Sequence, residues 1–217
     1  MSLIIVDTGV ANLSSVKFAF DRLGVSAVIT DAPETITSTD RVILPGVGAA
    51  PYAMKTINAK GLTPVLQSLT QPVMGICLGM QLIFETLEEG GSPVKGLGLV
   101  PGTIKALDTK GQPSPHMGWN TLTKAKDDPL LEGINDNDYA YFVHSFAAPV
   151  SDITLASSEY GSRFSAIVRH KNVYGCQFHP ERSSRVGAKI LENFLNCLLY
   201  TSPSPRDQRG SRMPSSA

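Results

Sequence analysis

The sequence predicts an α/β fold in which a mostly parallel central sheet is flanked by helices, with an added region of antiparallel or mixed strands in the second half. Up to Gly90-Gly91, short apolar runs alternate with segments of helical periodicity, as in strands joined by crossover helices. Beyond that point extended runs follow one another directly, as in antiparallel sheets. With 217 residues, 42% of them hydrophobic, the chain is long enough for one substantial core.

The first half supplies the parallel strands. The pattern predicts a strand over 3–7 and then a helix that ends at Gly24 and places four apolar residues on one face: Leu13, Val16, Phe20 and Leu23. A short helix is expected after Pro33. Further strands are predicted over 25–30, 41–44 and 73–76, and further helices over 52–69 and from Leu78 through Glu85.

The second half is predicted to contain shorter strands joined by turns. The extended runs are 97–107, 139–146, 154–157, 166–169 and 173–178. The last helix places Val186, Ile190, Phe194 and Cys197 or Leu198 on its inner face. Residues 1–200 therefore form the predicted domain. Residues 201–217 carry five Ser, three Pro and three Arg, and are expected to be a disordered tail, either native or foreign to the domain.

Composition excludes several classes of function. Lys plus Arg equals Asp plus Glu at 19 each, so no basic excess attracts nucleic acid or anionic lipid. No apolar run approaches the roughly 18 residues of a membrane span, and residues 1–7 resemble a first strand instead of a signal peptide. Three cysteines without a C-x-x-C pair disfavour a disulfide framework or a zinc site. We expect a cytoplasmic protein without a metal or cofactor.

The candidate nucleophile is Cys77, which lies between Gly75 and Gly79 where the predicted strand becomes a helix. Glycines on both sides allow the sharp turn that presents a nucleophile in hydrolases. The dipole of the following helix favours a thiolate, and the Leu78 N–H is placed to stabilise an oxyanion. A buried structural cysteine is the alternative, because this composition produces Gly-x-Cys-x-Gly by chance in roughly two chains in a hundred.

Two loops at the carboxyl ends of other predicted strands are further candidates. Pro45-Gly46-Val47-Gly48 could expose a second oxyanion N–H, from the Val47-Gly48 segment. A plain strand-terminating turn is the alternative. The segment from Asp7 to Asn12 either belongs to the same rim or only caps the next helix through Asn12.

A thiolate nucleophile needs a histidine oriented by a third group, and His179 is the candidate because Glu181 follows it across Pro180. A chance His-x-Glu has odds of roughly one in seven, so coincidence with the cysteine motif falls to a few in a thousand. His116 and His144 are equally consistent with structural and site roles. His170 is expected to be solvated in a polar turn, and Cys176 to be inert packing.

These motifs resemble class I glutamine amidotransferases, and in more detail the glutaminase subunits of imidazole glycerol phosphate synthases. The resemblance spans about residues 2–199 and rests on 75–81, 179–181, 7–13, 44–48, 115–120 and 141–145. It implies hydrolysis of glutamine to glutamate and ammonia. The ammonia would pass to a (β/α)₈-barrel cyclase in a heterodimer, which makes imidazole glycerol phosphate and aminoimidazole carboxamide ribotide in histidine biosynthesis.

The resemblance also implies roles for individual residues. Cys77 would be the nucleophile, His179 the base and acid, and Glu181 the group that orients His179. Leu78 and the Val47-Gly48 segment would supply oxyanion N–H groups. The glutamine site would be lined by Gln81, Ser145 and Phe146. The cyclase-facing surface would include Asn12, Met117, Trp119, Tyr141 and Arg182.

Two other functions remain open from the sequence alone. One is a stand-alone cysteine hydrolase of γ-glutamyl compounds, which would need a roomier pocket and no partner. The other is a non-catalytic regulatory subunit, against which the presence of Cys77, His179 and Glu181 argues.

Overall fold

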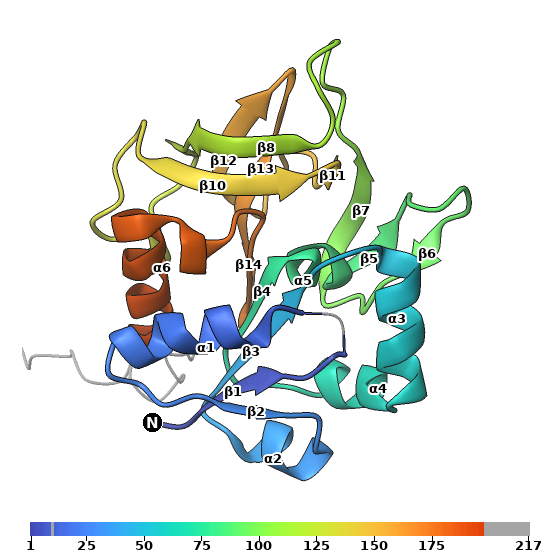
Figure 1. Ribbon diagram of the computed structural model, residues 1–217, viewed down its shortest axis with the longest axis vertical. Coiled ribbons are helices and arrows are strands. Elements are labelled where there is room, and N and C mark those ends of the chain that lie inside the picture. Colours follow the sequence, from blue (N-terminus) through green and yellow to red (C-terminus); the bar gives the residue numbers. More distant parts are fainter. Residues whose placement is uncertain (10, 198–217) are drawn as a thin grey trace, which may run out of the picture.

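The computed structural model describes residues 1–9 and 11–197, which form helices on both faces of a large sheet (Figure 1). The predicted tail lies outside the described residues. The sheet has eight strands, and the fold class predicted from the sequence is confirmed. In spatial order the strands are β2 (Val28–Thr30), β1 (Leu3–Val6), β3 (Arg41–Gly46), β4 (Val73–Cys77), β14 (Val173–Cys176), β13 (Ser162–His170), β12 (Thr154–Tyr160) and β9 (Thr123–Lys124).

The sheet is parallel from β2 through β14 and antiparallel from there to β9. Strand β2 starts later than the predicted Val25, because Gly24 adopts φ +76° and Val25 donates its N–H to the Phe20 carbonyl at the end of α1 (Leu13–Arg22). That bond terminates the helix through a left-handed glycine. Residues 25–27 are thereby kept out of the strand.

The two faces of the sheet have separate cores, since successive strand residues point to opposite sides. Ile5 packs in a cluster with α1 and α6 (Ser184–Asn196), while Ile4 packs with the helices of the other face. The helices of that other face are α2 (Pro33–Ser38), α3 (Ala50–Ala59), α4 (Leu62–Gln67) and α5 (Leu78–Leu82). In the described part of the chain, no helix has the length and apolar character to cross a membrane.

The helix after Cys77 is shorter than predicted. α5 ends at Leu82, and Glu85 belongs to strand β5 (Phe84–Leu87), so the prediction of a helix through Glu85 is wrong. Tertiary pairing overrides the helical spacing, because β5 pairs with two strands of a separate four-stranded sheet. The other strands of that sheet are β6 (Val94–Lys95), β7 (Val100–Ala106) and β11 (Phe146–Ala147).

A two-stranded ribbon lies at the end of the large sheet toward which β4 runs (Figure 1). It pairs β8 (His116–Thr121) with β10 (Tyr139–His144) in antiparallel register. The sequence pattern predicts no strand at the position of β8. The predicted run 139–146 is divided at Ser145 between β10 and β11, which belong to different sheets.

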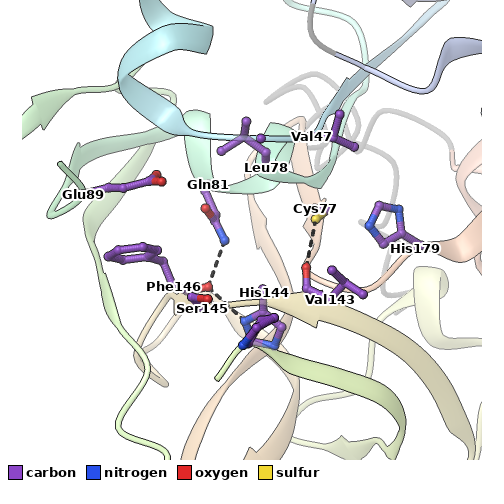
Figure 2. Close-up of a pocket in the computed structure, with 12 residues that line it drawn as sticks. Val47, Cys77, Leu78, Gln81, Glu89, Val143, His144, Ser145, Phe146 and His179 are labelled. Carbon is purple, nitrogen blue, oxygen red and sulfur yellow. Dashed lines mark hydrogen bonds between the residues drawn. The ribbon is translucent and has the colours of Figure 1, made fainter. Parts of the chain in front are cut away.

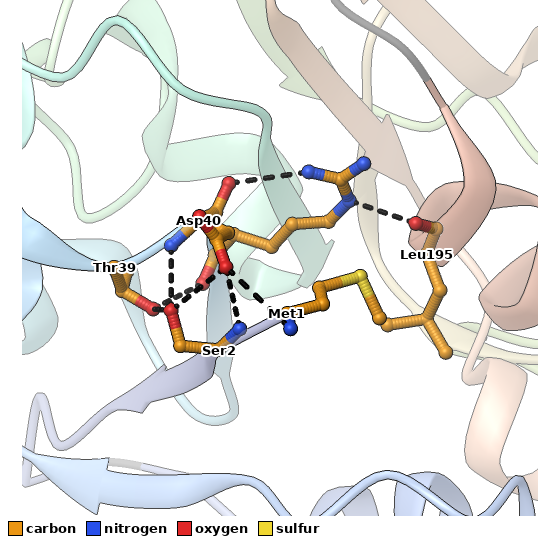
Figure 3. Close-up of polar contacts among 6 residues, drawn as sticks. Met1, Ser2, Thr39, Asp40 and Leu195 are labelled. Atoms are coloured by element: carbon orange, nitrogen blue, oxygen red, sulfur yellow. Dashed lines mark hydrogen bonds and ion pairs between the residues drawn. The ribbon is translucent and has the colours of Figure 1, made fainter.

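The carboxyl end of α6 is held by Arg41 at the start of β3. Its guanidinium donates to the main-chain carbonyls of Phe194, Leu195 and Cys197, at the carboxyl end of the helix, where the last carbonyls run out of partners in the next turn. Figure 3 shows the Leu195 contact beside Asp40, whose carboxylate accepts hydrogen bonds from the N–H and hydroxyl of Ser2. These Ser2 bonds lower the pKa of Asp40. The neighbouring residues Asp40 and Arg41 thus hold Ser2 and the carboxyl end of α6 next to each other.

We expect Arg41→Met to lower the free energy of unfolding by about 2 kcal/mol, because three charge-assisted hydrogen bonds at a helix carboxyl end are lost. For a domain of this size this corresponds to a fall in Tm of about 4–8 °C, measurable by calorimetry. Arg163→Met is the matched control, since Arg163 makes only an exposed ion pair with Glu159 at 3.8 Å. Arg163→Met should change the free energy of unfolding by no more than about 0.5 kcal/mol. Equal effects of both variants would contradict the capping role.

Candidate active site

Cys77 is the last residue of β4 and directly precedes α5, at the strand-to-helix boundary that the sequence predicts. Its backbone has φ 53° and ψ −113°, a conformation that L-residues rarely adopt. Such strain costs about 1–3 kcal/mol and persists only where the surrounding structure enforces it. The turn therefore resembles the strained elbow that exposes a nucleophile at the end of a strand.

The two flanking glycines are needed because the backbones on either side of the turn touch. A Cβ on Gly75 would lie 2.6 Å from the Gly79 carbonyl oxygen, and a Cβ on Gly79 would overlap the Leu44 carbonyl oxygen of β3. Any larger residue at either position would push α5 away from β3 and β4. The Gly-x-Cys-x-Gly spacing is thus explained by packing of the elbow against the neighbouring strand.

Pairing of β4 with its two neighbours brings distant segments to Cys77. On one side Gly46 of β3 lies opposite Cys77, so Val47 and Gly48 follow beside the sulfur. On the other side Cys176 of β14 lies opposite Ile76, so the chain that leaves β14 carries His179 past the same edge. Parallel strands end at the same edge of a sheet, so the loop after β3 and the loop after β14 both lie beside Cys77.

His179 and Glu181 form the hydrogen-bonded pair that the sequence predicts. The Nδ1 atom of His179 lies 2.8 Å from Oε1 of Glu181, whose side chain is only 4% exposed. Burial opposes a charge on the imidazole, but hydrogen bonding to Cys77 and Glu181, together with their negative charge, raises the pKa of His179 to about 10. The ring is therefore an imidazolium at neutral pH when Cys77 is a thiolate.

The turn that carries His179 is fixed to β10 by main-chain contacts. His179 donates its N–H to the Tyr141 carbonyl at 3.0 Å. The buried Ser183 hydroxyl donates to the His179 carbonyl and accepts from the Tyr141 N–H, at 2.7 and 2.9 Å. The local sequence pattern does not single out Ser183, because nothing in it shows that β10 would lie beside this residue.

The thiol of Cys77 has a second possible partner. Its Sγ atom lies 3.7 Å from the Val143 carbonyl oxygen, to which only the S–H form can donate (Figure 2). The same figure shows the His179 ring on another side of the sulfur. The site thus accommodates a resting thiol that donates to Val143 and a thiolate that is stabilised by the imidazolium. Proton transfer to His179 exchanges one state for the other.

A cavity of about 260 Å³ lies beside Cys77, and most of the predicted site residues line it. Glu181 does not line it but holds His179 from behind. The predicted residues that line it are Val47, Gly48, Cys77, Leu78, Gln81, Ser145, Phe146 and His179. Four further residues line it, namely Glu89, Pro115, Val143 and His144. The sequence pattern left a site role open for His144 and assigned none to the other three.

The far end of the cavity is polar. Glu89 lies near Gln81 in Figure 2, and its Oε2 atom accepts a hydrogen bond from the Ala50 N–H at 2.9 Å. Gln81 donates from Nε2 to the Phe146 carbonyl and to Oε1 of Gln177, at 2.9 and 3.0 Å. A carboxylate and an amide thus face a cavity whose other end holds the thiol. No sequence signal singles out Glu89, which stands in the acidic pair Glu88-Glu89.

The residues predicted to face a partner lie mainly on the outer side of the β8–β10 ribbon. Met117 and Trp119 are 63% and 52% exposed, and the Trp119 ring packs edge-to-face on Tyr141 at 5.9 Å. Arg182 is exposed in the short 3₁₀ helix η2 (Pro180–Arg182) next to His179. Asn12 accepts from the Ser15 N–H and so caps α1, one of the two roles considered for it.

The remaining cysteines and histidines lie outside this arrangement or support it. Cys176 is fully buried, and burial raises the pKa of its thiol well above the usual value. His170 ends β13 and is half-buried. His116 and His144 are buried and hydrogen-bonded to each other. Within residues 1–9 and 11–197, no cluster of three or more His, Cys, Asp or Glu could hold a metal ion.

Comparison with known proteins gives consistent matches. Residues 4–197 match the family model described as glutamine amidotransferase class-I. The chain is 54% identical over 205 residues to the imidazole glycerol phosphate synthase subunit HisH of Colwellia psychrerythraea, with 88% of this chain and 91% of that protein covered. It is 53% identical to the subunit of the same name from Idiomarina loihiensis, with 92% and 100% covered.

Solved structures agree in fold. A crystal structure described as glutamine amidotransferase superposes with a TM-score of 0.69 at 19% identity, covering 89% of this chain and 97% of that one. The structure of PurLQS from Thermotoga maritima gives 0.67 at 19% identity, covering 90% and 97%.

Proposed function

The chain belongs to the class I glutamine amidotransferase family, among the glutaminase subunits of imidazole glycerol phosphate synthases, and we propose that it hydrolyses glutamine through a thioester on Cys77. One observation carries the proposal: a strained cysteine and a histidine that is oriented by a buried carboxylate line the same cavity. This is the arrangement that nucleophilic catalysis by a thiol requires.

In the first half of the reaction, the Cys77 thiolate attacks the side-chain carbonyl carbon of glutamine. The carbonyl oxygen becomes negative and needs N–H donors at that moment. The Leu78 N–H is the first of α5 and has no intrahelical partner. Gly48, at φ +89° in the neighbouring loop, lines the same cavity and is the candidate region for the second donor. Both donors are main-chain N–H groups, so substitution of the side chains at these positions does not remove them.

His179 moves protons in both halves of the reaction. As an imidazolium it donates to the departing nitrogen, so that the C–N bond breaks, ammonia leaves and a thioester remains on Cys77. The neutral ring then takes a proton from water, which attacks the thioester, and glutamate is released with the thiol restored. Glu181 keeps the Nδ1 atom of His179 occupied, so the other ring nitrogen faces the reacting atoms.

The polar end of the cavity suits the α-amino group of glutamine. Both protons of Gln81 Nε2 are donated to protein oxygens, which leaves Oε1 as an acceptor. Together with the Glu89 carboxylate it offers two acceptors for an ammonium group. The substrate side chain then extends from this end to Cys77.

We expect Glu89→Gln to raise the KM for glutamine about tenfold or more with a smaller change in kcat, because a charge-assisted hydrogen bond to the substrate is lost. Steady-state glutamate release measures both constants. The matched control is Glu88→Gln, which removes the adjacent carboxylate that does not line the cavity. An unchanged KM in Glu89→Gln would contradict the proposed placement of the amino group.

The released ammonia is proposed to pass to a (β/α)₈-barrel cyclase, which would use it to make imidazole glycerol phosphate and aminoimidazole carboxamide ribotide in histidine biosynthesis in the cytoplasm. The outer face of the β8–β10 ribbon is the proposed docking surface, because Met117, Trp119 and Tyr139 are exposed there at 63%, 52% and 57%. Large exposed aromatic side chains of this kind are typical anchors of interfaces.

Trp119→Ala is expected to weaken the complex with the cyclase about tenfold or more, since a large aromatic anchor is removed from the centre of the ribbon. Titration calorimetry measures the Kd. Val28→Ala, at an exposed apolar position on the edge strand β2, is the control and should leave the Kd unchanged. Equal affinities of wild type and Trp119→Ala would exclude the ribbon as the main contact.

One experiment separates the proposed function from its alternatives. The chain is incubated with glutamine or with a γ-glutamyl peptide, each with and without the cyclase, and glutamate is measured. We expect hydrolysis of glutamine that rises when the cyclase is present. Preferred cleavage of the peptide, independent of the cyclase, would favour a stand-alone hydrolase. No hydrolysis of either compound would favour a regulatory subunit.

A further inference from the structure

A pair of buried histidines adjoins the glutamine site without taking part in the proposed chemistry. His116 and His144 are 2% and 5% exposed, and Nδ1 of His116 lies 2.9 Å from Nε2 of His144. The His116 ring is stacked between Tyr160 and Phe142, with centroids at 4.2 and 5.1 Å. Burial lowers the pKa of both imidazoles to about 4, so both rings are neutral at physiological pH.

Hydrogen-bond geometry determines which nitrogen of each ring carries the proton. Nδ1 of His144 lies 2.9 Å from the Phe146 carbonyl oxygen, which can only accept, so His144 is protonated at Nδ1. Its Nε2 is then an acceptor. Because Nδ1 of His116 faces that acceptor, His116 must also be protonated at Nδ1. The Nε2 atom of His116 is left as an acceptor.

Asn120, at the opposite end of this chain of hydrogen bonds, independently indicates the same direction of proton donation. Nδ2 of Asn120 donates to the Glu159 carbonyl at 2.9 Å, and Oδ1 accepts from the Thr121 N–H at 2.8 Å, which fixes the orientation of the amide. Nδ2 of Asn120 therefore faces Nε2 of His116, at 3.3 Å, as a donor. Protons thus point from Asn120 through His116 and His144 to the Phe146 carbonyl.

The hydrogen-bond chain ends at the residue that orients Gln81. The Phe146 carbonyl oxygen accepts from His144 and also from Nε2 of Gln81, so both of its lone pairs are occupied. The second proton of Gln81 Nε2 goes to Gln177. Rotation of the Gln81 amide by 180° would place its oxygen against the Phe146 oxygen. A fixed Phe146 carbonyl therefore keeps Oε1 of Gln81 as the acceptor available to the substrate.

We propose that His116 and His144 are positioning residues which, each as the neutral Nδ1–H form, hold the Phe146 carbonyl so that Gln81 presents Oε1 to the α-ammonium group of the substrate. This inference rests on the proposed glutaminase function for its substrate and on the hydrogen-bond chain for its geometry. Neither histidine touches the reacting carbonyl. Their effect is on recognition of the ammonium group and not on the chemical step.

Nitrogen-15 spectra of the histidine-labelled full chain test the tautomers directly. We expect His116 and His144 to be protonated at Nδ1 and unprotonated at Nε2 throughout pH 6–8. Assignment uses His116→Phe and His144→Phe, each of which removes one ring. A proton on Nε2 of either ring, or a doubly protonated ring at pH 7, would overturn the inference.

Kinetics of the complex with the cyclase test the effect on the substrate. His144→Phe should raise the KM for glutamine about fivefold, as expected for one lost hydrogen bond, with kcat within about twofold of wild type. His144→Asn retains a donor at the δ position and should recover most of the loss. His170→Asn, at a histidine remote from the cavity, should have the wild-type KM.

Glutaramate, which is glutamine without the α-amino group, separates positioning from general damage to the pocket. Its inhibition constant should be the same for wild type and His144→Phe, because it has no ammonium group for Gln81 to bind. An equal loss of affinity for glutamine and glutaramate would overturn the inference. Absence of glutamine hydrolysis by the wild-type complex would instead refute the proposed function, whereas the spectra would still decide the tautomers.

Discussion

Cys77→Ser is expected to reduce glutamine hydrolysis at least about 10³-fold, equivalent to about 4 kcal/mol of transition-state stabilisation. A serine hydroxyl at this elbow is not ionised by His179, and it forms an ester only with full base assistance. Glutamate release by the complex with the cyclase measures the loss. Binding of glutamine should persist, because the polar end of the cavity is unchanged.

Cys197→Ala is the matched control for removal of a thiol. Cys197 is buried at the end of α6, apart from the cavity, and its variant should retain activity within about twofold. Melting temperatures of both variants establish that the fold is intact. Full ammonia release by Cys77→Ser would show that the enzyme assignment is wrong.

Glu181→Gln is expected to lower kcat about 10²-fold or more while the position of the imidazole is kept. The glutamine oxygen can still accept from Nδ1 of His179, but the negative charge that stabilises the imidazolium is gone. The pKa of His179 should therefore fall below its wild-type value of about 10. Proton and nitrogen spectra of His179 as a function of pH measure the shift.

The same variant changes the pH dependence of stability, and the sign follows from the raised pKa. The usual pKa of 6.5 is lower than the folded-state value of about 10, so the contribution of His179 is complete below pH 6.5 and is lost as the pH rises toward 10. Urea unfolding at pH 7 and pH 10 should show a larger decrease for wild type than for Glu181→Gln. Equal decreases, with an unchanged His179 pKa, would contradict a stabilising charge on Glu181.

Local patterns predicted the elements that depend on neighbours in the chain. The strands that end at Val6 and Cys77 are runs of apolar residues, and α1 ends at a glycine because the left-handed turn needs one. The helical spacing gave a wrong prediction after Leu82. There, pairing with β7 and β6 forms strand β5 from residues that have helical periodicity. Strand β8 was missed because its polar and glycine-containing sequence becomes a strand only beside β10.

The sequence by itself determined the alternating strands and helices, the glycine spacing that permits the elbow at Cys77, and the His179-Glu181 pair, since each depends on contacts within a few residues. Only the tertiary structure decided that β14 lies beside β4 and so brings His179 to the sulfur, that Glu89 enters the cavity, and that His116 meets His144. The physical reason is that the order and register of strands follow from burial of the whole sheet. No local pattern contains that information.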